Sequence, residues 1–156
     1  MRPNKNVLYQ LTAGVIMCFL WSSEVHAVCR VSTTSINFGS YDVFSSIAST
    51  STGTITLSCS PQADVTIGIS NSSDSGTYFP RRMQHNSLSD TLEYNLYTSA
   101  NRTQVWGDGN HGTSDTHFLN VRNNNNTPII IYGLIPALQN ISTGVYSDQL
   151  VVTITY

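Results

Sequence analysis

Charge is scarce in this sequence of 156 residues. Only 10% of the residues are charged, the single lysine is Lys5, and the formal net charge is −2 at pH 7. Because no basic stripe is present, the sequence argues against nucleic acid as a partner. Few charges combined with abundant Ser, Thr, Asn and Gly are typical of an extracellular β-protein with a polar, uncharged surface.

Long apolar runs are also missing, with one exception near the N-terminus. Residues 7–21 form a mostly apolar stretch that is too short for a comfortable membrane span. Arg2 and Lys5 precede it, and a short polar region ends in Val25-His26-Ala27. This arrangement predicts a signal peptide over residues 1–27 and an exported mature domain over residues 28–156.

Cysteine is rare as well, with three residues in the chain. Cys18 falls in the predicted signal peptide, so Cys29 and Cys59 remain as an even pair in an exported domain, and no C-x-x-C motif is present. The pair predicts a structural disulfide. Closing a loop of roughly 30 residues in this way stabilises a fold by about 3.5 kcal/mol.

Helical periodicity is absent beyond about two turns, and the mature chain alternates instead. Strands are predicted over residues 28–38, 53–60, 65–70, 91–98, 128–136 and 144–156, with a short edge strand over 78–83 and a loop or edge segment over 41–52. The apolar run 128–136 is expected to be buried on both faces. Roughly seven short strands predict an all-β, immunoglobulin-like sandwich.

The last predicted strand is the most apolar. Leu150, Val152, Ile154 and Tyr156 share one face. Such a strand either closes an ordinary core or borders a groove that another chain completes, since an unpaired apolar strand invites aggregation.

Catalytic and metal-binding patterns are weak. His111 and His117 lie with Asp108 and Asp115 within ten residues. These side chains could bind a metal, but their spacing matches no defined site and no Glu closes a calcium loop. A polar surface loop is the simpler interpretation. No Ser occupies a G-x-S-x-G elbow, which argues against a serine hydrolase. With the weak metal pattern, the sequence therefore predicts no enzymatic activity, cofactor or metal.

Two further pairs of residues have simple structural interpretations. Arg81 and Arg82 form an isolated basic dipeptide that is interpreted as a solvated turn. Tyr78 and Phe79 could contact a surface or a sugar, but packing in the core or at an edge is the simpler interpretation.

Several motifs together resemble one known family. Cys29-Arg30-Val31-Ser32 is followed by Ile36-Asn37-Phe38-Gly39-Ser40-Tyr41-Asp42, and the second cysteine lies in Gly53-Thr54-Ile55-Thr56-Leu57-Ser58-Cys59. Further motifs are Leu92-Glu93-Tyr94-Asn95-Leu96-Tyr97, Val105-Trp106-Gly107-Asp108-Gly109, Tyr132-Gly133-Leu134-Ile135-Pro136 and the segment 144–156. Their order and spacing resemble spore coat protein U domains, which include subunits of archaic chaperone–usher pili.

The resemblance implies an incomplete immunoglobulin-like sandwich that a donor strand from another chain completes. Its partners would be a periplasmic chaperone, an outer-membrane usher and a neighbouring pilus or coat subunit. Leu150, Val152, Ile154 and Tyr156 would then border the groove that receives the strand. The function implied is that of a structural subunit of a pilus or coat, with a role in adhesion and biofilm formation.

One departure from the family pattern sets up an alternative. A shaft subunit carries about ten alternating residues before its first cysteine, whereas only Val28 precedes Cys29 after the predicted cleavage. We therefore expect an acceptor without a donor strand, either a cap of a fibre or a coat-type subunit. The alternative function is a tip-located adhesive module that binds a surface or glycan through loops around residues 107–117.

Overall fold

The protein is an all-β sandwich in a computed structural model that describes residues 26–122 and 128–156. The predicted signal peptide, apart from its last two residues, lies outside this range. The described residues contain no helix. In the described part of the chain there is accordingly no helix with the length and apolarity to cross a membrane.

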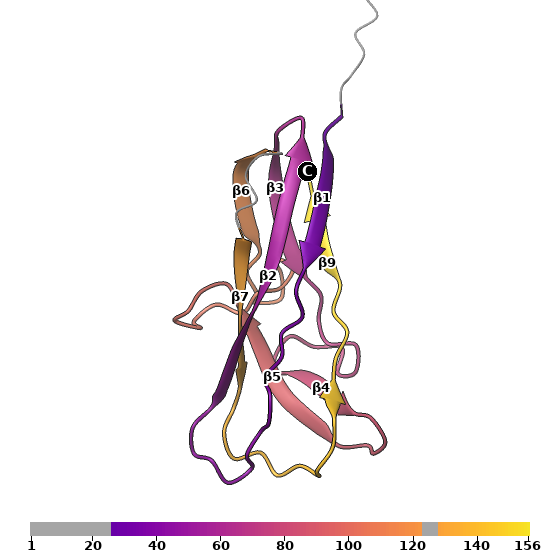
Figure 1. Ribbon diagram of the computed structural model, residues 1–156, viewed down its shortest axis with the longest axis vertical. Helices are drawn as coiled ribbons and strands as arrows, with labels where there is room; N and C mark the ends of the chain where they lie inside the picture. Colours follow the sequence, from indigo (N-terminus) through magenta and orange to yellow (C-terminus); the bar gives the residue numbers. More distant parts are fainter. Residues whose placement is uncertain (1–25, 123–127) are drawn as a thin grey trace, which may run out of the picture.

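The described residues form nine strands in two sheets (Figure 1). The larger sheet has the order β1-β2-β7-β5-β4-β8, and the smaller sheet has the order β6-β3-β9. The strands are β1 Val28–Thr33, β2 Ser49–Ser60, β3 Ala63–Ile69, β4 Arg81–His85, β5 Thr91–Tyr97, β6 Thr116–Val121, β7 Pro128–Ile135, β8 Tyr146–Ser147 and β9 Val152–Thr155.

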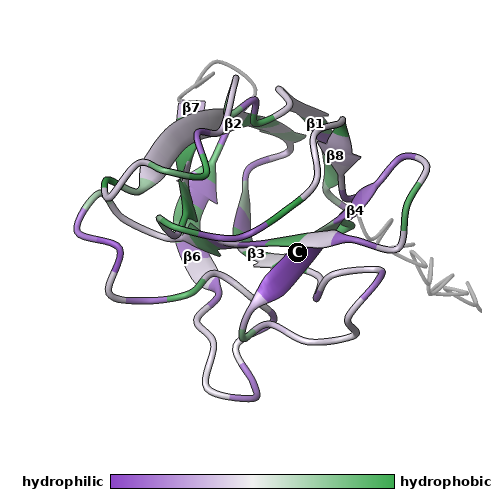
Figure 2. Cartoon of the chain, turned by 90° about the horizontal axis from the view of Figure 1, so that it is seen from below, coloured by the Kyte–Doolittle hydropathy of each residue, from purple (hydrophilic) through white to green (hydrophobic). Residues whose placement is uncertain are grey.

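The core lies between the sheets and follows from alternation. In β2, Ile55, Leu57 and Cys59 are buried while the threonines and serines between them are partly exposed. β3 repeats this pattern with Val65, Ile67 and Ile69. Trp106 is fully buried and donates its indole N–H to the carbonyl oxygen of Ile67 at 3.0 Å. The end-on view shows the strands arranged around this interior (Figure 2).

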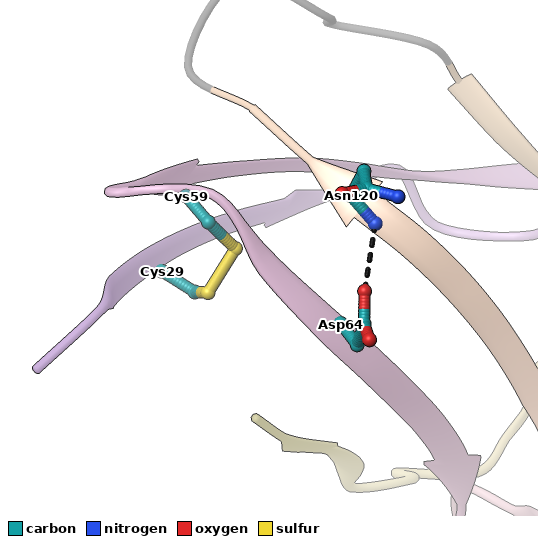
Figure 3. The surroundings of a disulfide bond; sticks show 4 residues. All are labelled: Cys29, Cys59, Asp64 and Asn120. Atoms are coloured by element: carbon teal, nitrogen blue, oxygen red, sulfur yellow. Dashed lines mark hydrogen bonds between the residues drawn. A yellow bond between two sulfur atoms is a disulfide. The ribbon is translucent and has the colours of Figure 1, made fainter.

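The predicted disulfide is present and joins the first two strands (Figure 3). Cys29 and Cys59 lie directly opposite each other in the antiparallel β1–β2 pair, with their Cα atoms 4.0 Å apart. Beside the disulfide in Figure 3, the backbone N–H of Asn120 donates to Oδ1 of Asp64 at 2.9 Å, where the β3–β6 register shifts. The disulfide therefore holds β1 in register at the rim of its sheet.

Several of the predicted strands differ from the structure. The last four residues of the predicted loop or edge segment 41–52 belong to β2, and the predicted edge strand 78–83 corresponds to β4, which pairs with both β5 and β8. β7 is buried on one face only, because its outer residues remain partly exposed. The predicted strand 28–38 keeps ladder pairing only to Thr33, and the predicted strand 144–156 divides into β8 and β9. β6 was not predicted, since its residues follow a long polar loop and carry no clear alternation.

Candidate strand-binding groove

A cavity of about 970 Å³ runs between two segments of the sandwich. Residues 33–44, which begin at the last residue of β1, form one wall. Residues from 141 to 152, which include β8 and end at the first residue of β9, form the other. Its floor consists of core side chains: Ile69, Met83, Leu92, Tyr94, Leu96, Ile131 and Ile135. The core is thus open between the segment after β1 and the segment before β9.

The first wall lies close to the sheet because two glycines lie beneath it. A Cβ added at Gly53 would lie 2.6 Å from Cγ1 of Ile36. A Cβ added at Gly133 would lie 2.6 Å from Cζ of Phe38. Both separations are well below van der Waals contact, so only glycine lets the two side chains rest on β2 and β7.

Tyr41 fixes the far end of the same wall. Its hydroxyl donates to the carbonyl oxygen of Pro136 at 2.8 Å and accepts the backbone N–H of Gln139 at 2.9 Å. The Gln139 side chain in turn bonds the backbone N–H and carbonyl oxygen of Glu93 at 2.8 Å each. The wall is therefore tied to the loop after β7 and, through it, to β5.

The second wall is held by the β4–β5 hairpin. The backbone N–H of Ser142 donates to Oδ2 of Asp90 at 3.1 Å, and the Tyr146 hydroxyl donates to the carbonyl oxygen of Ser142 at 2.9 Å. Hydrogen bonds from Ser142 hold the pKa of the Asp90 carboxyl below its usual value. β8 pairs with β4 through only two residues, so side chains contribute much of the attachment.

One polar group interrupts the apolar floor. The Tyr94 hydroxyl donates to Oδ2 of Asp148 at 2.8 Å, and Ser73 donates its hydroxyl to Oδ1 of Asp148 at 2.7 Å. Burial, followed by the hydrogen bond and charge of Asp148, raises the pKa of Tyr94. Tyr94 therefore stays neutral and orients Asp148 on the second wall.

The backbone of β9 presents hydrogen-bonding groups to the groove. Ser70 donates its N–H to the carbonyl oxygen of Val151 at 2.9 Å, so Val151 faces β3. Because antiparallel pairing alternates, Thr153 also faces β3, whereas the N–H and C=O groups of Val152 and Ile154 point toward the free edge.

The backbone of β1 behaves in the same way. Thr34 donates its N–H to the carbonyl oxygen of Thr54 at 2.9 Å, so the even-numbered residues of this segment face β2. The N–H and C=O groups of Val31 and Thr33 therefore point away from β2. Among the described residues these two edges are unpaired, and each reaches the cavity, at Thr33 and at Val152. This is the arrangement that an added strand would fill.

The structure separates the four residues predicted to border a groove. Leu150 and Val152 line the cavity. Ile154 packs against the core beside it, and Tyr156 is 57% exposed. Sequence reasoning did not assign the first wall to this site, although the alternation of Ile36 and Phe38 was a usable signal.

The histidine and aspartate side chains of residues 108–117 do not converge on one point. Nδ1 of His111 lies 3.7 Å from Oδ2 of Asp108, and Nε2 of His117 lies 3.5 Å from Oδ1 of Asp115. His117 also bonds the Thr66 hydroxyl at 2.8 Å. Within residues 26–122 and 128–156, no group of three or more potential metal ligands gathers.

The interpretation of Arg81 as part of a solvated turn was wrong. Arg81 is fully buried on β4, and it donates to the carbonyl oxygens of Ser70 and Trp106 at 2.7 Å each and to Oδ1 of Asn95 at 2.9 Å. Its guanidinium lies 5.1 Å from the centre of the Tyr78 ring. Burial lowers the pKa of Arg81. The hydrogen bonds compensate for burial, which a dipeptide pattern does not reveal.

Comparisons with known proteins agree with this architecture. Residues 15–153 match the family model of the Spore Coat Protein U domain. Protein U of Myxococcus xanthus is 31% identical to this chain over 131 residues, which make up 78% of this chain and 71% of Protein U.

A solved structure shares the fold. It is the pre-assembly complex of the chaperone CsuC with the tip adhesion subunit CsuE, from the archaic chaperone–usher Csu pili of Acinetobacter baumannii. The match has a TM-score of 0.58 and 20% sequence identity over 85% of this chain. This chain spans 40% of the length of the matched chain.

Proposed function

Because the chain belongs to the spore coat protein U family, we propose that it is a non-enzymatic structural subunit of a surface pilus or coat, assembled through the chaperone–usher pathway. The observation that carries this proposal is the open groove between the segment after β1 and the segment before β9. Its floor consists of core side chains, and a strand from another chain would cover them.

The groove is suited to β-augmentation. An added strand would pair its backbone with the edge groups of Val31 and Thr33 on one side, or of Val152 and Ile154 on the other. Its alternate side chains would enter the space above the core floor. Main-chain pairing supplies affinity in this mode, and the buried side chains supply specificity. A periplasmic chaperone would occupy the groove first, and a neighbouring subunit would replace it after passage through an outer-membrane usher.

Secretion is part of the same proposal. Residues 1–27 would act as the signal peptide, and residues 28–156 would form the mature domain in the periplasm and at the cell surface. The disulfide between Cys29 and Cys59 supports an oxidising compartment. Mass spectrometry of the mature protein tests this: a first residue other than Val28 would require another cleavage site.

The experiment that tests the groove is periplasmic co-expression of the tagged chain with and without a candidate archaic chaperone. We expect the chaperone to raise the recovery of soluble protein severalfold as a 1:1 complex, with only a small fraction recovered as free chain, because the uncovered core favours aggregation. Val152→Asp, which places a charge in the groove, should abolish the complex. The matched control Thr153→Asp, on the exposed face of the same strand, should keep it.

Two outcomes would contradict the proposal. One is equal recovery of soluble monomer with and without the chaperone, which would indicate a complete sandwich. The other is equal recovery of the complex for the Val152→Asp and Thr153→Asp variants, which would place the partner elsewhere.

A second candidate function is adhesion through the loops at residues 107–113. The observation that favours it is the contact between this loop and the segment before β4: His111 stacks on Tyr78 with ring centres 6.3 Å apart, and Phe79, which is 54% exposed, lies beside Gly112. Retention on a hydrophobic surface or a glycan array tests this role. Equal retention of the wild type and Phe79→Ser would contradict it.

A further inference from the structure

His85 is a buried titratable side chain at the end of β4, with 7% of its surface exposed. Its Nδ1 accepts the backbone N–H of Ser87 at 3.0 Å and that of Leu88 at 2.9 Å. Its Nε2 lies 3.2 Å from the carbonyl oxygen of Thr143. Because Nδ1 accepts two hydrogen bonds, the ring proton belongs on Nε2, and Nε2 donates to Thr143. This network requires a neutral imidazole.

The His85 ring also lies against the second wall of the groove. The Tyr146 ring meets it edge to face, with centres 5.0 Å apart and planes at 82°. A Cβ added at Gly144 would overlap Nε2 of His85. Thr143, Gly144 and Tyr146 all line the cavity. The position of the ring therefore sets the position of this wall.

We propose that His85 is a positioning residue of the groove, and that its neutral form holds the second wall in the arrangement that accepts an added strand. This inference rests on the proposed function. Protonation would place a hydrogen on Nδ1, which then faces two N–H donors and has no acceptor. The ring must move, and the contacts with Thr143, Gly144 and Tyr146 move the wall with it. Strand binding is therefore strong at neutral pH and weakens as the pH falls.

Two other titratable groups face His85. Asp90 lies on the turn after β4, and hydrogen bonds from Ser142 lower its pKa. Burial, and then the charge of Asp90, raises the pKa of Tyr146 on β8. Asp90 thus stays ionised and Tyr146 stays neutral between pH 5 and 8, where histidine side chains titrate. The Asp90 charge attracts a cationic imidazole, but it does not restore an acceptor for Ser87 and Leu88.

The test measures how the affinity of the full mature chain for a strand depends on pH. The probe is a synthetic peptide of alternating valine and threonine with terminal arginines, acetylated at its N-terminus and amidated at its C-terminus, because none of its groups then titrates between pH 5 and 8. Peptide binding is followed by fluorescence anisotropy from pH 5.5 to 7.5. We expect affinity to fall roughly tenfold toward pH 5.5, since two hydrogen bonds are lost.

Variants assign the dependence to His85. In His85→Asn the amide oxygen can still accept from Ser87 and Leu88, and in His85→Gln the amide can still reach Thr143, but neither variant titrates. Either variant that folds should bind with the same affinity at both pH values. His117→Asn, at a largely exposed histidine on β6, should keep the wild-type pH profile.

The outcomes separate this inference from the proposed function. Equal affinity of the wild type at pH 5.5 and 7.5, or an unchanged pH dependence in the His85 variants, would overturn the role of His85 while leaving the groove intact. Absence of peptide binding at every pH, together with a stable monomer that needs no chaperone, would instead overturn the proposed function.

Discussion

Replacing Gly133 with alanine is expected to destabilise the fold by displacing Phe38. The new Cβ would lie 2.6 Å from Cζ and 3.0 Å from Cε1 of Phe38, and 3.3 Å from Cγ2 of Ile36. Carbon atoms in contact prefer about 3.5–4.0 Å, so Phe38 must move by about 1 Å. Overpacking of this kind costs about 1–3 kcal/mol, and the reduced freedom of the unfolded chain offsets about 0.4–1 kcal/mol of it.

The net loss of about 1–2 kcal/mol corresponds to a decrease in Tm of roughly 4–8 °C for a domain of this size. Thermal and urea unfolding of the purified full chain measure it. Phe38 lines the groove, so Gly133→Ala should also weaken strand binding.

A double-mutant cycle identifies the cause of the loss. Phe38→Leu removes the ring atoms nearest to position 133, so Gly133→Ala should cost less when it is combined with Phe38→Leu than when it is made in the wild type. Equal costs in both backgrounds would refute the idea that the wall depends on Phe38 resting over a glycine.

Further predictions concern stability. Arg81→Met should destabilise the fold by about 3 kcal/mol, because buried acceptors lose their donor, whereas Arg82→Met should cost less than about 1 kcal/mol, because its ion pair with Glu93 is half-exposed. Similar urea midpoints for the two variants would contradict this account. Reduction of the bond between Cys29 and Cys59 should cost about 3.5 kcal/mol, seen as a lower Tm in dithiothreitol. An unchanged Tm of the reduced protein would mean that pairing alone holds β1.

The sandwich could be predicted from alternation, because buried and exposed residues alternate in β2 and β3 as they do in the sequence. The disulfide could be predicted as well, because only two cysteines follow the predicted signal peptide. A single sequence contains both signals: the alternation of residues predicts the strands, and the number of cysteines predicts the disulfide.

The walls of the groove were harder to predict. Residues 34–44 and 141–151 largely lack ladder pairing, so their positions depend on Tyr41, His85 and the two glycines under Ile36 and Phe38. Contacts between residues so distant in the sequence leave no periodic signal. The burial of Arg81 was not predicted for the same reason, because its hydrogen-bond acceptors are mostly carbonyl groups of other segments.

The central claim is that a strand from another chain pairs at the groove, and amide hydrogen exchange at β9 tests the β9 edge directly. In the free chain, the amides of Val152 and Ile154 should exchange quickly, while the amide of Thr153, which faces β3, should be protected. In the complex with a chaperone that pairs along this edge, all three amides should be protected. Rapid exchange in the complex at both edges, at Val152 and Ile154 and also at Val31 and Thr33, would contradict the account. Full protection of Val152 and Ile154 without any partner would contradict it as well.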